Sequence, residues 1–77
     1  MNTSKTKILI TGVAGLLGSH LAEHLVSRGY RVFGIDNLSG GYLGNVPIGV
    51  NFYSLDLANR ETLAEFFSVV KPDYVYH

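Results

Sequence analysis

The feature that most constrains this sequence is a short apolar run that leads into three evenly spaced glycines. Residues 8–11 end at Gly12, and Gly15 and Gly18 follow at intervals of three before an amphipathic segment begins. This pattern is typical of a buried strand that turns abruptly into a helix. We expect Gly12 to allow the tight turn, Gly15 to let a diphosphate approach the backbone, and Gly18 to let the helix pack closely on the strand.

The start of a helix after such a turn suits an anion, because its first N–H groups lack helical partners and the helix dipole is positive there. A glycine triplet alone also fits a turn that binds nothing. Here, however, Asp36 ends the next apolar run, 18 positions after Gly18, close to the spacing at which an acid reaches a dinucleotide ribose. Together these features predict dinucleotide binding. A P-loop is excluded, because no Gly-Lys-Ser/Thr follows the turn.

Periodicity predicts strands over residues 7–11, 31–35, 50–55 and 73–77, and helices over residues 14–28 and 60–70. The apolar positions expected to cover the sheet are Leu17, Leu21, Ala22, Leu25 and Val26 in the first helix, and Leu63, Phe66, Phe67 and Val70 in the second. Asn59 is a plausible N-cap and Gly29 a helix stop. We expect the aromatic residues Phe52, Tyr53, Phe66, Phe67, Tyr74 and Tyr76 to lie in the core.

The alternation of strands and helices predicts an α/β fold, the first half of a Rossmann-type doubly wound parallel sheet with strand order 3-2-1-4. A dinucleotide crevice needs two such halves. The 77 residues supply only one, so we expect residues 1–77 to be the N-terminal part of a dinucleotide-binding domain, with the remainder of that domain and a substrate domain absent. The fourth strand would leave an apolar edge unpaired.

Charge and cysteine content narrow the partners and the compartment. The formal net charge is zero, so nothing steers the chain towards nucleic acid or an anionic membrane. Without cysteine there is no disulfide or thiolate chemistry. Lys5 and Lys7 before an uncharged stretch resemble a signal peptide, but three glycines interrupt the stretch and no small-x-small cleavage site follows. We therefore expect a cytoplasmic protein.

Four stretches, in order, match motifs of one known family. Residues 11–20 read T-G-V-A-G-L-L-G-S-H, residues 36–39 read D-N-L-S, residues 56–57 read D-L and residues 72–77 read P-D-Y-V-Y-H. They resemble the extended short-chain dehydrogenase/reductases, most of all the NAD-dependent sugar-nucleotide epimerases and dehydratases, which open with T-G-x-x-G-F-I-G-S-H. The G-x-x-G-x-x-G spacing separates this branch from the short-subunit branch, which has G-x-x-x-G-x-G.

The resemblance implies that NAD is the cofactor. Backbone N–H groups near Leu16 and Leu17 would hold the pyrophosphate, and Asp36 would accept both hydroxyls of the adenosine ribose. The residues that would line the adenosine side are Asn37, Leu38, Ser39 and Gly41. Asp56 would bond the adenine amino group, with the Leu57 backbone beside it. One departure is that Gly41 and Tyr42 stand where the family often has Arg or Lys.

Two of these acids also have plainer interpretations. Asp36 could begin an Asx-turn at the end of its strand, and for Asp56 a role at the entry to the second helix is nearly as well supported as adenine contact. His20 and His24 are four apart on a helix, a spacing that suits a metal, but no third ligand is near in the sequence. We expect them to be ordinary polar positions and predict no metal site.

The catalytic residues of the family have no counterpart here. In that family a Tyr-x-x-x-Lys pair, with a Ser or Thr, carries proton transfer. Tyr30, Tyr42 and Tyr53 are followed four places later by Gly34, Val46 and Leu57, and Tyr74 and Tyr76 lie too near the end. We therefore predict no catalytic residue within the chain.

Two functions remain open. One is the NAD-binding portion of an enzyme that epimerises or dehydrates a nucleotide-linked sugar by transient hydride transfer to NAD. The other is a non-catalytic NAD-binding sensor or scaffold of the same fold. For the enzyme, the resemblance implies a nucleotide-sugar substrate bound through the missing C-terminal part. It also allows a homodimer of the full-length protein.

Overall fold

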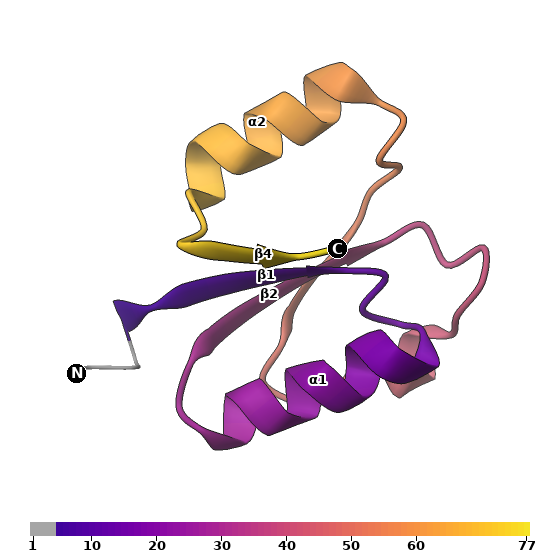
Figure 1. Ribbon diagram of the computed structural model, residues 1–77. Helices are drawn as coiled ribbons and strands as arrows, with labels where there is room; N and C mark the ends of the chain where they lie inside the picture. Colours follow the sequence, from indigo (N-terminus) through magenta and orange to yellow (C-terminus); the bar gives the residue numbers. More distant parts are fainter. Residues whose placement is uncertain (1–4) are drawn as a thin grey trace.

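A computed structural model describes residues 5–77 (Figure 1). Along the chain the elements are β1 (Lys7–Thr11), α1 (Leu16–Ser27), β2 (Arg31–Asp36), the 3₁₀ helix η2 (Leu43–Asn45), β3 (Asn51–Ser54), α2 (Arg60–Val70) and β4 (Tyr74–Tyr76). The predicted helices and strands are all present; the bounds of β1 and α2 are those predicted, and the ends of the others differ by at most two residues. The η2 turn was not predicted, because the residues around it read as a glycine-rich loop.

The strands form one parallel sheet in the order β3-β2-β1-β4, which confirms the predicted topology. The register places Leu9 of β1 beside Phe33 of β2 on one side and Val75 of β4 on the other. Helix α1 lies on one face of the sheet and α2 on the opposite face, as Figure 1 shows. All four strands run in the same direction, so their carboxyl ends lie together at one end of the sheet, called here its carboxyl edge.

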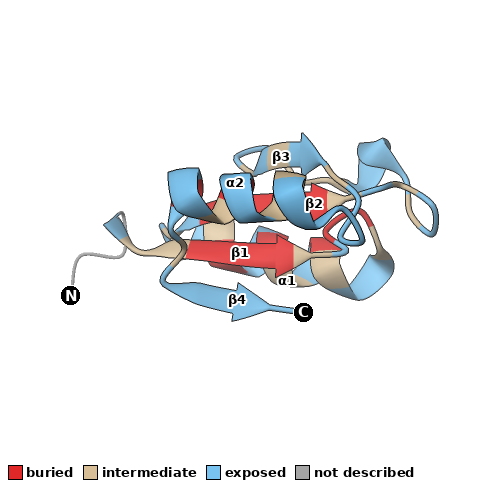
Figure 2. Ribbon diagram, turned by 90° about the horizontal axis from the view of Figure 1, so that it is seen from above, coloured by how far each residue is buried: buried red, intermediate tan, exposed pale blue. Residues whose placement is uncertain are grey.

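The two central strands are buried on both faces, as expected for a parallel sheet covered by helices (Figure 2). Alternate residues of β1 and β2 point to opposite sides. The core under α1 is made by Ile8, Ile10, Val13, Ala22, Leu25 and Val32. The core under α2 is made by Leu9, Phe33, Ile35, Phe66 and Val70, with Leu63 and Phe67 packed against it. The predicted apolar stripe of α2 is therefore confirmed.

The predicted stripe of α1 is wrong at its first position. Ala22 and Leu25 are buried and Leu21 and Val26 pack against them, but 86% of Leu17 is exposed. The helix begins only at Leu16, so its first turn lies beside the carboxyl edge of the sheet rather than over the strands. Helical spacing predicts which side chains lie on one face of a helix. It does not predict how far along the helix the sheet extends beneath that face.

The prediction that six aromatic residues lie in the core is wrong for three of them, all tyrosines. Tyr53, Tyr74 and Tyr76 are exposed, since they belong to β3 and β4, the two outer strands. Tyr53 still packs edge-on against Phe66, with ring centroids 5.1 Å apart. Aromatic content indicates strand structure, but each strand's place in the sheet determines how much of it is covered.

Neither helix described between residues 5 and 77 combines the length and the hydropathy needed to cross a bilayer. The start of α2 and the end of α1 are set by local chemistry that the sequence indicates. Asn59 caps α2, its side-chain oxygen accepting a hydrogen bond from the Thr62 N–H at 3.1 Å. Gly29, with φ of 89°, follows the last turn of α1 in the left-handed conformation that glycine permits.

Replacing Asn59 with alanine is expected to lower the free energy of unfolding by about 1 kcal/mol, because the Thr62 N–H loses its acceptor. Denaturant unfolding of the full-length protein measures the change. Asn59→Ser is the control, since serine also accepts at an N-cap, and it should retain most of the stability. Equal stability of the alanine variant and the unaltered protein would show that the cap contributes nothing.

Candidate dinucleotide-binding site

The site is built on the turn between β1 and α1. Gly12 has φ of 69°, and its N–H donates to the Ile35 carbonyl at 2.9 Å, which ties the turn to the end of β2. The Gly15 N–H then donates back to the Gly12 carbonyl at 3.0 Å and closes the turn. The left-handed φ of Gly12 confirms the expected reason for a glycine at this position.

Close packing requires a glycine at position 18 and leaves little room for a side chain at position 15. A Cβ on Gly18 would lie 2.3 Å from the Gly12 carbonyl oxygen, and one on Gly15 would lie 3.2 Å from the same atom. The helix therefore approaches the strand as closely as predicted. Gly15 is also the N-cap of α1 and supplies no capping side chain, and the first turn contains no acid. The first N–H groups of α1 therefore have no side chain of that turn competing with an anionic ligand.

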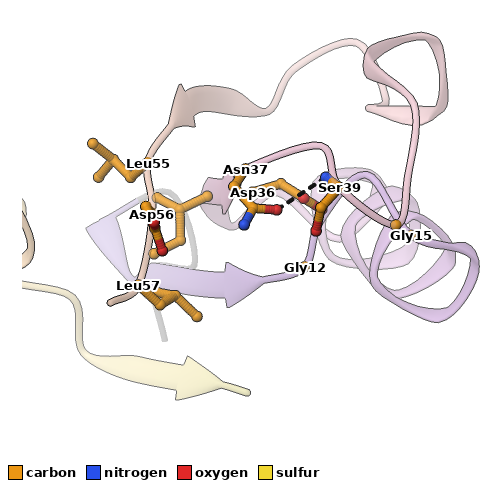
Figure 3. Close-up of a pocket in the computed structure, with 10 residues that line it drawn as sticks. Gly12, Gly15, Asp36, Asn37, Ser39, Leu55, Asp56 and Leu57 are labelled. Carbon is orange, nitrogen blue, oxygen red and sulfur yellow. Dashed lines mark hydrogen bonds between the residues drawn. The ribbon is translucent and has the colours of Figure 1, made fainter. Parts of the chain in front are cut away.

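A cavity of about 320 Å³ opens beside this turn at the carboxyl edge of the sheet (Figure 3). The turn, the end of β2 with the loop after it, and the segment after β3 all contribute. The lining residues are Gly12, Gly15, Ile35, Asp36, Asn37, Ser39, Gly40, Leu55, Asp56 and Leu57. The sequence predicts site residues in three separate stretches, and the fold brings members of all three around one space. These members are Gly12, Gly15, Asp36, Asn37, Ser39, Asp56 and Leu57.

Asp36 holds the site together through both carboxylate oxygens. Oδ2 accepts from the Ala14 N–H at 3.0 Å, and Oδ1 accepts from the Leu38 N–H at 2.7 Å. The second bond is the Asx-turn that was one interpretation of this residue, and it stabilises Leu38 at its positive φ of 64°. A carboxylate oxygen accepts more than one hydrogen bond, so each still has capacity for a ligand hydroxyl. The binding role predicted for Asp36 is compatible with this geometry.

Asp56, like Asp36, both makes local hydrogen bonds and lies at the cavity. Its Oδ1 accepts from the Ala58 N–H at 2.9 Å, and its carbonyl accepts from the Asn59 N–H at 3.0 Å, so it shapes the entry to α2. Its side chain is also exposed at the cavity, beside Leu57. The helix-entry interpretation is therefore present in the structure, and the adenine contact stays a prediction.

Some predicted residues lie outside this cavity. Leu16, Leu17 and Gly18 line a second, more apolar hollow of about 510 Å³ on the other side of the turn, between α1 and β4. Gly12 and Gly15 line both, so the glycine turn stands between them. Leu38 is half-buried and does not line the first cavity. Gly41 packs against the Ala14 backbone, and Gly40, which was not predicted, takes its place in the lining.

The second hollow also contains residues that sequence reasoning missed. Thr11, Tyr76 and His77 line it, and Thr11 Oγ1 lies 2.8 Å from His77 Nδ1. The predicted strand order could have indicated them, because residues at the carboxyl ends of neighbouring parallel strands lie close together.

The chemistry of the first cavity suits a dinucleotide. The glycine turn offers N–H donors beside Asp36, and the cavity has both polar and apolar lining residues.

Comparison with known proteins agrees with this geometry. The model of the NAD dependent epimerase/dehydratase family matches residues 8–77. UDP-glucose 4-epimerase of Streptomyces lividans is 41% identical over 61 residues, which cover 79% of this chain and 18% of that protein.

Two solved structures resemble the fold closely. UDP-glucose 4-epimerase of Thermotoga maritima, crystallised with UDP-glucose, superposes with a TM-score of 0.90 at 39% identity, covering 94% of this chain and 23% of that one. The Thermus thermophilus enzyme, in complex with NAD, gives a TM-score of 0.85 at 41% identity, covering 91% and 22%. The chain thus spans about a fifth of the length of the relatives it matches.

Proposed function

Because the chain belongs to the NAD dependent epimerase/dehydratase family, we propose that it is the N-terminal part of the NAD-binding domain of an enzyme that epimerises or dehydrates a nucleotide-linked sugar. The observation that carries the proposal is the convergence of the glycine turn, Asp36 and residues 55–57 on one cavity. In such an enzyme NAD supplies the hydride acceptor.

In this proposal the residues of the chain bind and orient the cofactor. N–H groups of Leu16 and Leu17 face the diphosphate at the start of α1, where exposure of 74% and 86% leaves both residues accessible. Asp36 accepts the adenosine ribose hydroxyls, and the segment after it lines the adenosine side. The residues of that segment at the cavity are Asn37, Ser39 and Gly40, while Leu38 and Gly41 support the loop and the turn behind them. Asp56 faces the adenine amino group, beside Leu57.

The proposal places the substrate and the catalytic groups in a longer protein. Within residues 5–77, β4 pairs with one strand, β1, and Tyr74, Val75 and Tyr76 are exposed along it. Unpaired strand edges and exposed apolar residues are usually covered in stable proteins. The full-length protein would bind its nucleotide sugar beyond these residues, form a homodimer, and reside in the cytoplasm, a compartment with which the lack of cysteine is compatible.

We expect the full-length protein to convert its nucleotide sugar without net oxidation, because a hydride taken from the sugar must return to it. The experiment incubates the protein with NAD and candidate UDP- and dTDP-sugars, following NADH absorbance and product formation together. Product should form without accumulating NADH. Steady release of NADH would instead mark a net dehydrogenase. Tight NAD binding with no turnover of any sugar nucleotide would favour a sensor or scaffold.

A further inference from the structure

The carbonyl of Ala14, inside the glycine turn, is held by the loop that follows β2. It accepts from the Tyr42 backbone N–H at 3.2 Å and from Asn45 Nδ2 at 3.1 Å. The N–H of the same residue donates to Asp36 Oδ2 at 3.0 Å. Ala14 is fully buried, so its carbonyl has no access to water and depends on these donors. Both backbone polar groups of Ala14 are therefore satisfied by residues 36–45.

The loop can reach Ala14 only because residue 41 has no side chain. A Cβ on Gly41 would lie 2.4 Å from the Ala14 carbonyl oxygen and 2.9 Å from the Gly15 nitrogen. This contact explains the glycine at position 41, one of the two positions where the family often has a basic residue. Here the loop approaches the turn with its backbone.

Holding the Ala14 carbonyl also sets the direction of the next N–H group. A peptide bond is planar and trans, so the Ala14 carbonyl and the Gly15 N–H point in opposite directions as one rigid unit. That N–H donates to the Gly12 carbonyl and closes the turn at the start of α1. The donor on Asn45 is therefore linked through one peptide plane to the N–H of Gly15, the N-cap residue of α1.

We infer that Asn45 is a positioning residue, which orients the Ala14–Gly15 peptide and thereby the start of α1 towards the diphosphate of a bound dinucleotide. The inference rests on the proposed NAD binding and adds a residue that lies outside both cavities. Asn45 contacts the turn and lines neither cavity, so its effect should depend on which part of the ligand the turn holds. A purely structural role would weaken all ligands alike.

The test measures binding of NAD, ADP and adenosine to the full-length protein and to its Asn45→Ala variant by calorimetric titration. Loss of one hydrogen bond, about 0.5–1.5 kcal/mol, corresponds to a two- to ten-fold rise in Kd. We expect that rise for NAD and ADP, which carry the diphosphate, and a change of less than twofold for adenosine. Asn45 is exposed, so its truncation should leave the fold intact.

Asn51→Ala is the matched control. Asn51 Nδ2 also donates to a backbone carbonyl, that of Val32, at 3.3 Å, but it does so at the amino ends of β2 and β3, away from the site. This variant should leave all three affinities within twofold. Asn45→Leu provides a second test, because leucine keeps the approximate shape of asparagine without its amide, and it should reproduce the selective loss.

Two results would overturn the inference while leaving the proposed function in place. One is unchanged NAD affinity in both Asn45 variants, and the other is an equal loss for NAD, ADP and adenosine, provided in each case that Asp36→Ala still weakens NAD binding. Failure of the unaltered protein to bind NAD would instead overturn the proposed function, and the inference with it.

Discussion

Replacing Gly18 with alanine is expected to destabilise the full-length protein by about 2 kcal/mol and to weaken NAD binding ten- to a hundred-fold. In an open helix alanine would stabilise by about 1 kcal/mol relative to glycine. Here the added Cβ would lie 2.3 Å from the Gly12 carbonyl oxygen and 3.0 Å from the Gly12 carbonyl carbon. Both are backbone atoms that cannot rotate away, and overpacking of this kind costs about 3 kcal/mol. The clash therefore outweighs the gain in helix propensity.

The effect on binding has a separate cause. To relieve the clash, the start of α1 must move away from β1, and its N–H groups move with it. Hydrogen bonds to a charged partner contribute about 1.5–3 kcal/mol, which corresponds to the stated loss of affinity. Denaturant unfolding and NAD titration of the same samples measure the two effects.

The glycines of this chain provide graded controls for that experiment. A Cβ on Gly44 would meet nothing within 4 Å, and Gly44 lies outside the cavities, so Gly44→Ala should change neither property. Gly15→Ala, with its nearest contact at 3.2 Å, should fall between the two in stability. If Gly18→Ala proved as stable as Gly44→Ala, the close approach of α1 to the turn would not be a feature of the protein in solution.

Replacing Asp36 with alanine is expected to weaken NAD binding by about ten- to a hundred-fold and to reduce the preference for NAD over NADP. A 2′-phosphate carries about −1.5 to −2 charges and would meet the carboxylate at contact distance. No arginine stands at Val13 or Asn37 to offset the repulsion. The ribose hydrogen bonds proposed for Asp36 would be made to a charged group, and such bonds contribute about 1.5–3 kcal/mol, which sets the expected loss for NAD.

The structure changes how this experiment must be interpreted. Asp36 also accepts from the Ala14 and Leu38 N–H groups, so removing it disturbs the turn and the loop for either cofactor. The informative quantity is therefore the ratio of the Kd values for NADP and NAD, in which that shared disturbance cancels. We expect the ratio to fall at least tenfold in Asp36→Ala.

Asp56→Ala is the matched comparison for Asp36. Asp56 lies at the same cavity and also accepts a backbone N–H, that of Ala58, but the proposal places it against adenine, which NAD and NADP share. Its loss should weaken both cofactors equally and leave the ratio unchanged. An unchanged ratio in Asp36→Ala as well would show that Asp36 supports the loop without contacting the ribose.

The local features of this fold follow from the sequence because short-range chemistry fixes them. The glycine spacing predicts the turn, Asn59 predicts the start of α2, and the apolar strands predict a parallel sheet in the order 3-2-1-4. Each depends on backbone sterics or hydrogen bonds between residues a few positions apart, or on a strong rule for the handedness of crossovers. Asp36 was identified by its spacing in the sequence, because it ends the next apolar strand after the glycine turn and the first helix.

Only the tertiary structure decided what each of these residues contacts. The sequence alone does not reveal that Leu17 lies beyond the edge of the sheet, that Tyr74 and Tyr76 are on an outer strand, or that Gly40 rather than Gly41 faces the cavity. Nor does it show Asn45 reaching the Ala14 carbonyl across 31 positions of chain. These facts depend on where covered surface ends and on how an irregular loop folds back, and both are set by packing between distant segments. Periodicity and spacing encode the neighbours along a helix or strand, whereas contacts across a loop are fixed only when the whole sheet assembles.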